Sequence, residues 1–218
     1  MKVISFIAGL LILLIIALSF NIGKKDKPTY YEVISLKEYE RRTGDHQDYY
    51  ESEKAIYERE KRYFQDVVSQ EKTAAYVGKV LYRLTSKKNS DIKKYHITLV
   101  DKKVWKISIV GMDSLVVYIQ KHDGRILRIE RYIYPQYRKE SYKNKLINTP
   151  ELAAQIGICY LCDIYGKDVI KEEIPFNIVE FQHSWLLEGT LPPNSYGGVA
   201  SIYITKKDGM VIDYIHEK

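Results

Sequence analysis

The chain has 218 residues, a formal net charge of +6 and 45% hydrophobic residues, enough apolar material for one domain or two small ones. Its two cysteines lie far from residue 20, which excludes a lipidated N-terminal cysteine. Residues 24–147 carry 28 Lys and Arg against 18 Asp and Glu, about +10, whereas residues 148–218 carry 5 against 10, about −5. This asymmetry predicts different partners for the two halves.

Residues 3–22 contain no charged side chain and follow Lys2. A run of about twenty apolar residues is long enough to span a bilayer, and it also fits a secretory signal. Ala17-Leu18-Ser19 offers a cleavage site, but an uncleaved anchor suits the following residues equally well. The lysines after the run weakly favour a cytoplasmic C-terminus. A very short N-terminal tail, however, usually stays in the cytoplasm, which would place the C-terminus outside. We expect export, with the protein in the bacterial envelope, anchored or released to the periplasm.

Polar residues without a sustained period fill positions 24–47, which predicts a tether with one short strand near residues 31–36. From Asp48 the apolar residues recur at helical spacing as far as Val68, and a second helix is expected over residues 74–84. The basic residues of this half lie beside the apolar run, where anionic lipid headgroups would attract them.

Alternating apolar and polar residues after this helix predict a meander of about four strands that ends near Tyr134. Asp101-Lys102 is expected to form its first turn. Asp123-Gly124 predicts a tight hairpin in which both residues adopt positive φ. Residues 135–147, rich in tyrosine and basic side chains, are interpreted as a linker or a late edge strand.

The second half begins with a clear helix start, because Thr149 can cap the helix and Pro150 occupies its first position. We expect this helix to end at Gly166 and four strands to follow, over residues 176–181, 185–191, 199–205 and 210–215. Asp208-Gly209 supplies a second hairpin turn.

The two halves repeat one another. Residues 116–124 return as residues 201–209, Trp105 returns as Trp185, and the small residues at 74–78 return at 153–157. The predicted fold is therefore α+β, with two related units, each a helix followed by an antiparallel meander, behind an N-terminal hydrophobic helix. The expected parts are a signal peptide or anchor (1–23), a tether (24–47), the first unit (48–134), a linker (135–147) and the second unit (148–218).

Cys159 and Cys162 form a C-x-x-C pair, which occurs in redox sites and as half of a zinc site. No second ligand pair stands at zinc spacing, and the cysteines fall too far along the predicted helix for dipole activation. We interpret them as ordinary helix positions, with a disulfide formed after export and a catalytic pair as the alternatives.

The remaining candidate chemistry is sparse. The five histidines are scattered, no serine stands in a nucleophile elbow, and Gly197-Gly198 enters a strand without the Lys-Ser/Thr of a phosphate loop. We expect no catalytic residues, no metal, no cofactor and no nucleic-acid partner. An enzyme with a pocket in a curved sheet remains a third hypothesis, and it would require converging titratable groups.

Binding features are concentrated in the second unit. The chain has 20 tyrosines, a residue type enriched at protein interfaces, although many would also suit half-buried sheet faces. The acidic residues of this unit are either a solvated face or a surface for a basic partner. The candidate partner-binding residues are Glu172, Glu173, Glu180, Glu188 and Tyr196, with Asp213 in the same acidic set.

Residues 148–218 resemble the immunity proteins of the nuclear transport factor 2-like fold, the antidotes of bacterial polymorphic toxins. The resemblance rests on Glu173-Ile174-Pro175-Phe176, Trp185, Gly189-Thr190-Leu191-Pro192, Gly197-Gly198-Val199-Ala200 and Asp208-Gly209, in this order. It implies a non-catalytic protein that neutralises a cognate toxin by direct contact, in which Trp185, Gly189, Thr190, Leu191, Pro192, Gly197, Gly198, Asp208 and Gly209 are mainly structural.

The first unit keeps Trp105 and Asp123-Gly124 but lacks the Gly-Thr-Leu-Pro and Gly-Gly pieces. The repeat as a whole is also similar to the PepSY-type inhibitory modules of envelope proteins and propeptides. The alternative function is therefore a regulatory module that acts on an envelope protease or sensor. In either case the partner is a toxin or another envelope protein, and residues 3–22 contact the membrane if they are uncleaved.

Overall fold

A computed structural model of the chain describes residues 30–43, 65–85, 94–110, 114–133, 135–142, 145–192 and 195–216. In these residues the fold is α+β, as predicted, with four helices and two five-stranded sheets where two meanders of about four strands were expected. Residues 3–22 lie outside the described part, and so does the expected helix from Asp48 up to residue 64. None of the described helices is long and apolar enough to cross a membrane. From Tyr31 onward the chain forms one compact unit.

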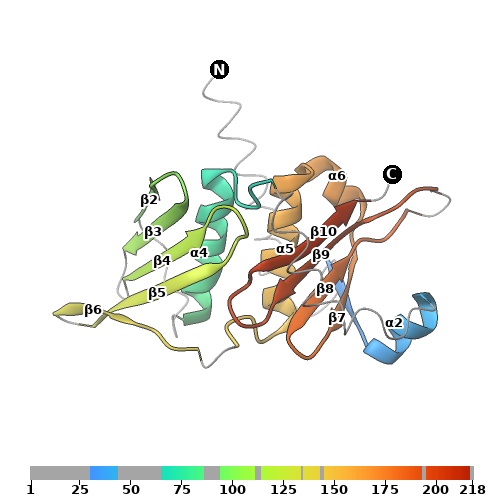
Figure 1. Ribbon diagram of the computed structural model, residues 1–218, viewed down its shortest axis with the longest axis horizontal. Helices are drawn as coiled ribbons and strands as arrows, with labels where there is room; N and C mark the ends of the chain where they lie inside the picture. Colours follow the sequence, from blue (N-terminus) through green and yellow to red (C-terminus); the bar gives the residue numbers. More distant parts are fainter. Residues whose placement is uncertain are drawn as a thin grey trace, which may run out of the picture. The chain divides into compact units, whose positions relative to one another are not determined.

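The first repeat is a helix packed on an antiparallel meander (Figure 1). The sheet has the order β2-β3-β4-β5-β6, so each strand pairs with the next along the chain. Side chains alternate between the helix side and the opposite side, as the period of two in the sequence predicts. The elements are α4 (Glu71–Thr85), β2 (Lys94–Val100), β3 (Val104–Val110), β4 (Leu115–Gln120), β5 (Ile126–Ile133) and β6 (Gln136–Lys139).

The second repeat has the same plan, with its helix on one face of a four-stranded meander (Figure 1). As expected, the Thr149 hydroxyl caps the helix by accepting a hydrogen bond from the amide of Leu152 at 3.2 Å. Gly166 ends the helix region with a positive φ of 93°. The elements are α5 (Pro150–Ile164), α6 (Lys167–Glu172), β7 (Phe176–Glu180), β8 (Ser184–Glu188), β9 (Ala200–Thr205) and β10 (Val211–His216).

The segment expected to be a tether with one short strand forms that strand and, in addition, a helix that was not expected. Residues 31–34 form β1 (Tyr31–Ile34), which pairs in parallel with β7 at the edge of the second sheet. The next residues form α2 (Leu36–Thr43), whose Leu36 and Tyr39 pack on the face of this sheet opposite α5. A polar, short amphipathic helix buries too little apolar surface for its pattern to stand out in the sequence.

Part of the segment interpreted as a linker or a late edge strand, residues 135–147, forms a strand. Residues 136–139 form β6, which pairs with β5 at the edge of the first sheet, in agreement with the alternative of a late edge strand. All four residues of β6 are exposed, and such a strand lacks the apolar alternation that identifies buried strands.

The two Asp-Gly turns are wider than predicted. Positive φ occurs at Gly124 (70°) and Gly209 (68°) but not at Asp123 or Asp208. In each turn the glycine amide donates a hydrogen bond to the residue four positions earlier, at 3.0 Å, so four residues form the loop. The two-residue turn with positive φ at both positions is instead Asp101-Lys102, with φ of 49° and 58°.

The two tryptophans make equivalent hydrogen bonds in the two repeats. The indole Nε1 of Trp105 donates to the carbonyl of Val68 at 2.8 Å, and that of Trp185 donates to the carbonyl of Ile147 at 2.9 Å. Both carbonyls belong to the segment just before the repeat's helix. The duplication read from the sequence is therefore a structural duplication.

The repeats also share one core. Residues of α4, α5 and both sheets form a single apolar cluster, and the two helices contact each other. The amide of Ile126 donates to the carbonyl of Asp208 at 2.9 Å, and the amide of Val211 donates to that of Asp123 at 2.8 Å. Since these residues occupy equivalent positions in the two repeats, the two hydrogen bonds are related by an approximate two-fold symmetry. Tyr160 crosses the same boundary and donates from its hydroxyl to the carbonyl of Gly124 at 2.7 Å.

Candidate functional site

The β8–β9 loop, residues 189–199, is the main feature that the second repeat adds to the first. Its two ends are held together, because the amide of Gly189 donates to the carbonyl of Ala200 at 2.9 Å. Thr190 fixes the first end further: its amide donates to the carbonyl of Glu173 and its hydroxyl to that of Pro175, each at 2.9 Å. The loop therefore starts from a fixed base.

Glu173 lies underneath this base and is only 6% exposed. One carboxylate oxygen accepts a hydrogen bond from the amide of Ala200 at 2.8 Å, and the other lies 2.8 Å from Nε2 of His216. Buried carboxylates require such partners, because removal from water is strongly unfavourable without them. The interpretation of Glu173 as a surface contact residue is therefore corrected: it is a buried anchor of the loop.

The first residue of the Gly-Thr-Leu-Pro motif, Gly189, must be a glycine for a steric reason. A Cβ added to Gly189 would lie 2.3 Å from the Glu173 carboxylate oxygen and 2.9 Å from its Cβ. A side chain at this position would displace the carboxylate from the amide of Ala200. Glu173, Gly189 and Thr190 thus work together, although they are separated by up to 17 positions in the sequence.

The far part of the loop faces solvent. Tyr196 is fully exposed, at 101% of its reference surface, and Leu191 is 41% exposed. Pro192 and Gly197 are exposed as well, and Gly197 has a positive φ of 137°, a conformation that favours glycine. A fully exposed tyrosine on the same loop as an exposed leucine offers contact area together with a polar tip.

The acidic residues do not gather at one point. Glu188 ends β8 where the loop begins, and it pairs across the sheet with Asn177 and Ser201. Glu180 lies at the other end of β7, three residue pairs away, and forms an ion pair with Lys206 at 2.7 Å. Three strand residues span roughly 10 Å, so Glu180 is remote from the loop base. Glu172 is exposed at the end of α6, and Asp213 is half-buried on β10.

Trp185 and the second Asp-Gly turn lie away from the loop tip. Trp185 is 1% exposed, and the ammonium of Lys206 lies 5.0 Å from the centre of its ring. Asp208 accepts a hydrogen bond from the Thr205 hydroxyl at 2.6 Å and thereby closes its own turn. These contacts fit the structural roles expected from the motif.

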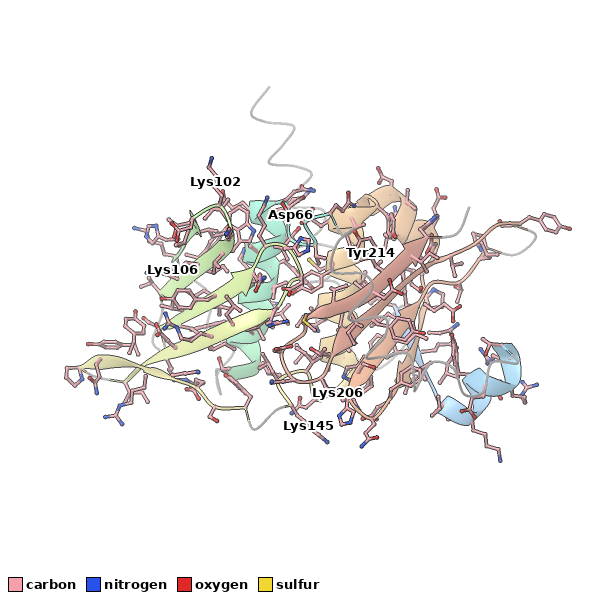
Figure 2. All side chains as sticks on the ribbon, viewed as in Figure 1. Asp66, Lys102, Lys106, Lys145, Lys206 and Tyr214 are labelled. Carbon is pink, nitrogen blue, oxygen red and sulfur yellow. The ribbon has the colours of Figure 1, made fainter. Side chains whose placement is uncertain are left out.

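Sequence reasoning missed His216 and its neighbours. The histidine lies on β10, with its ring centre 5.2 Å from that of Tyr165, and burial raises the pKa of Tyr165. Tyr214, labelled in Figure 2, lies on the same strand, and its hydroxyl oxygen accepts a hydrogen bond from the amide of Gln65 at 3.1 Å. The pairing of His216 with Glu173 joins residues 43 positions apart, and no local pattern reports such a contact.

The cysteines occupy ordinary helix positions. Both are free thiols on α5, half-buried against the shared core. Burial raises the pKa of Cys162 to about 11 and that of Cys159 well above its usual value. A thiol that holds its proton at neutral pH is a poor nucleophile. In the described residues, no group of three or more His, Cys, Asp or Glu side chains is placed to hold a metal ion.

Comparisons with known proteins agree with the resemblance seen in the sequence. Residues 152–218 match the family described as NTF2 fold immunity protein. YbbC of Escherichia coli K12 is 40% identical over 112 residues, which is 51% of this chain and 83% of YbbC. YhhH of the same organism is 34% identical over 86 residues, or 39% of this chain and 67% of YhhH. Both relatives are described as uncharacterized.

One solved structure was also matched, the C-terminal domain of Bacillus megaterium YpeB. The identity is 16%, and the match covers 67% of this chain and 62% of that domain. The TM-score is 0.26, which is too low to indicate a common fold.

Proposed function

The chain belongs to the family of the Escherichia coli proteins YbbC and YhhH, and we propose that it is an immunity protein that neutralises a cognate bacterial toxin by direct contact. The match of residues 152–218 to NTF2 fold immunity proteins supports the proposal, because that family name implies binding to a toxin. The role is proposed to be one of binding without catalysis.

The observation that carries the proposal is how the second repeat presents its loop. The residues matched to the immunity family build a rigid base of Glu173, Thr190 and Ala200, and Tyr196 projects from that base fully exposed. Binding energy in protein interfaces is concentrated in a few anchors, with tyrosine among the commonest. An anchor on a fixed base loses less conformational freedom on binding than one on a loose segment.

The charge of the second repeat indicates the kind of toxin surface. This repeat has a balance of about −5, and Glu188 and Glu172 lie at the beginning of the loop and beside its base. Opposite charges speed encounter and select among partners. We propose that Tyr196 and Leu191 contact a toxin surface that is rich in Lys and Arg.

We propose in addition that the protein works in the bacterial envelope. Residues 3–22 are uncharged and long enough to span a bilayer, which supports an anchor or a cleaved signal. Fractionation of cells that express a C-terminally tagged chain tests this location. Recovery of the tag in the soluble cytoplasmic fraction would refute the envelope assignment. The immunity assignment does not depend on this result.

The direct test of the function is co-expression with the toxin encoded beside this gene. We expect the wild-type chain to restore growth, and Tyr196→Ala to lose most of that protection. Tyr95→Ala on β2 is the matched control, because it also removes an exposed tyrosine, 42% exposed, but from the helix side of the first repeat's sheet. Persistent growth arrest with well-expressed wild-type protein would reject the assignment and favour a regulatory role towards an envelope protease or sensor.

A further inference from the structure

The first sheet has a basic outer face, on the side opposite α4. Trp105, Ile107 and Ile109 of β3 are buried on the helix side, so the residues that alternate with them point the other way. Lys106 stands across from Tyr118 on β4, which stands across from Arg128 on β5. The charged side chains of this face, called the basic face below, are Lys94, Lys106, Arg128, Glu130 and Lys139.

The equivalent face of the second sheet is built differently. There the positions of Lys106 and Tyr118 are taken by Leu186 and Tyr203, a pair with the same register and with exposures of 1% and 8%. Leu36 and Tyr39 of α2 pack against that apolar face. In the first repeat, by contrast, Lys106 is half-buried and Arg128 exposed, and Lys102 points into solvent from the adjacent turn (Figure 2).

The charge on the basic face is not neutralised within the face. Its single acid, Glu130, is paired with Arg128 at 3.1 Å. The face therefore keeps an excess of positive charge from three lysines, Lys94, Lys106 and Lys139. Lys94 and Lys139 are exposed. Three lysines on one face of an antiparallel sheet, within a half of the chain that carries about +10, form a positive surface that attracts an anionic partner.

The aromatic residues of this face favour a lipid surface over a nucleic acid. Single-stranded nucleic acids bind through bases that stack on free aromatic rings. Here the guanidinium of Arg128 lies 4.3 Å from the ring centre of Tyr118, so that ring already has a cationic partner. Tyr132 and Tyr137 pack edge to face with each other at 5.1 Å. What the face offers is positive charge and tyrosine hydroxyls, which suit the headgroup region of a bilayer.

We propose that the basic face of the first repeat lies against an anionic phospholipid surface. This contact leaves the β8–β9 loop of the second repeat available, and it does not depend on the immunity function. A lysine near an anionic membrane strengthens binding about fivefold. The contact is electrostatic, so it weakens at 1 M salt, where charges are screened beyond about 3 Å.

Vesicle flotation of the full chain tests the proposal, with phosphatidylcholine vesicles and with vesicles that contain phosphatidylglycerol. Insertion of the apolar residues 3–22 is indifferent to headgroup charge, so the ratio between the two vesicle types reports the electrostatic contribution of the basic side chains, and the variants isolate the share of the basic face. We expect the wild type to prefer the anionic vesicles. The triple variant Lys94→Glu/Lys106→Glu/Lys139→Glu should lose that preference by at least about a hundredfold, because three attractions of about fivefold each are lost and three repelling carboxylates are added.

The control is Lys167→Glu/Lys171→Glu/Lys207→Glu in the second repeat, which changes the net charge equally at one half-buried and two exposed lysines. It should retain the preference. An equal loss in both triple variants, or none in the first, would overturn the proposal. If the basic-face triple variant binds the vesicles like the wild type but no longer binds a single-stranded oligonucleotide, the proposal is overturned in favour of nucleic acid. A Lys→Gln version of each triple variant, checked for its unfolding midpoint, excludes misfolding as the cause.

Discussion

The carboxylate of Glu173 accepts a hydrogen bond from the amide of Ala200 at 2.8 Å, and so holds the end of the β8–β9 loop from below. The same residue accepts from the amide of Thr190 through its carbonyl, at the start of the loop. One buried glutamate therefore fixes both ends of the segment that we propose as the toxin contact.

Substitution of Glu173 should loosen the loop and destabilise the protein. Glu173→Ala leaves the Ala200 amide and the His216 ring without their partner, and an unpaired buried polar group costs about 1–3 kcal/mol. We expect faster amide exchange over residues 189–200 in hydrogen–deuterium exchange, with α4 unaffected. Glu172→Ala, at the exposed neighbouring position, is the control. Equal protection of the loop in both variants would contradict the anchoring role.

The two tryptophans should contribute alike to stability. Trp105→Phe and Trp185→Phe each remove one indole donor to a main-chain carbonyl, and we expect each to lower the free energy of unfolding by about 1–3 kcal/mol. Because the repeats share one core, urea unfolding followed by circular dichroism should remain a single transition in both variants. Two separate transitions would show that the repeats fold independently.

Stability should fall at alkaline pH. Burial raises the pKa of Cys162 to about 11 and that of Tyr142 to about 12, and it raises those of Cys159 and Tyr160. Between the ordinary pKa values near 9 to 10 and these higher ones, the unfolded chain releases protons that the folded chain holds. The stabilisation is therefore complete below pH 9 and is lost as the pH rises towards 12.

Urea unfolding at pH 7, 9, 10 and 11, under reducing conditions, measures this loss. A fully shifted group contributes a slope of up to about 1.4 kcal/mol per pH unit. Cys159→Ser/Cys162→Ser should reduce the slope, since it removes two of the groups. A free energy of unfolding that stays constant from pH 9 to pH 11 would be incompatible with buried, protonated thiols.

Much of the fold could be predicted because its signals are local. Alternation identified the strands of both meanders, and Thr149-Pro150 identified the start of α5. The parallel pairing of β1 with β7 could not be predicted, since it joins residues 145 positions apart. The shape of the Asp-Gly turns also differed, because each is a four-residue loop whose Asp carbonyl accepts a hydrogen bond from the other repeat, a long-range contact that no local pattern reports.

The candidate site was predicted in part. The motif residues Gly189 and Thr190 were recognised from their resemblance, but only the structure shows that they meet Glu173. A glutamate is normally expected at the surface, and its burial depends on His216 from a distant strand. Tyr196 was chosen as one of 20 tyrosines, and its full exposure distinguishes it from those that cover the sheets.

The central claim is that the β8–β9 loop binds the toxin, and the affinity of the purified chain for the toxin encoded beside it tests this most directly. Titration calorimetry should show that Tyr196→Ala weakens binding by about 30-fold or more, equivalent to about 2 kcal/mol, with an unchanged unfolding midpoint. Tyr95→Ala should bind like the wild type. Equal affinity of wild type and Tyr196→Ala, or an equal loss in both variants, would contradict the assignment of this loop as the contact.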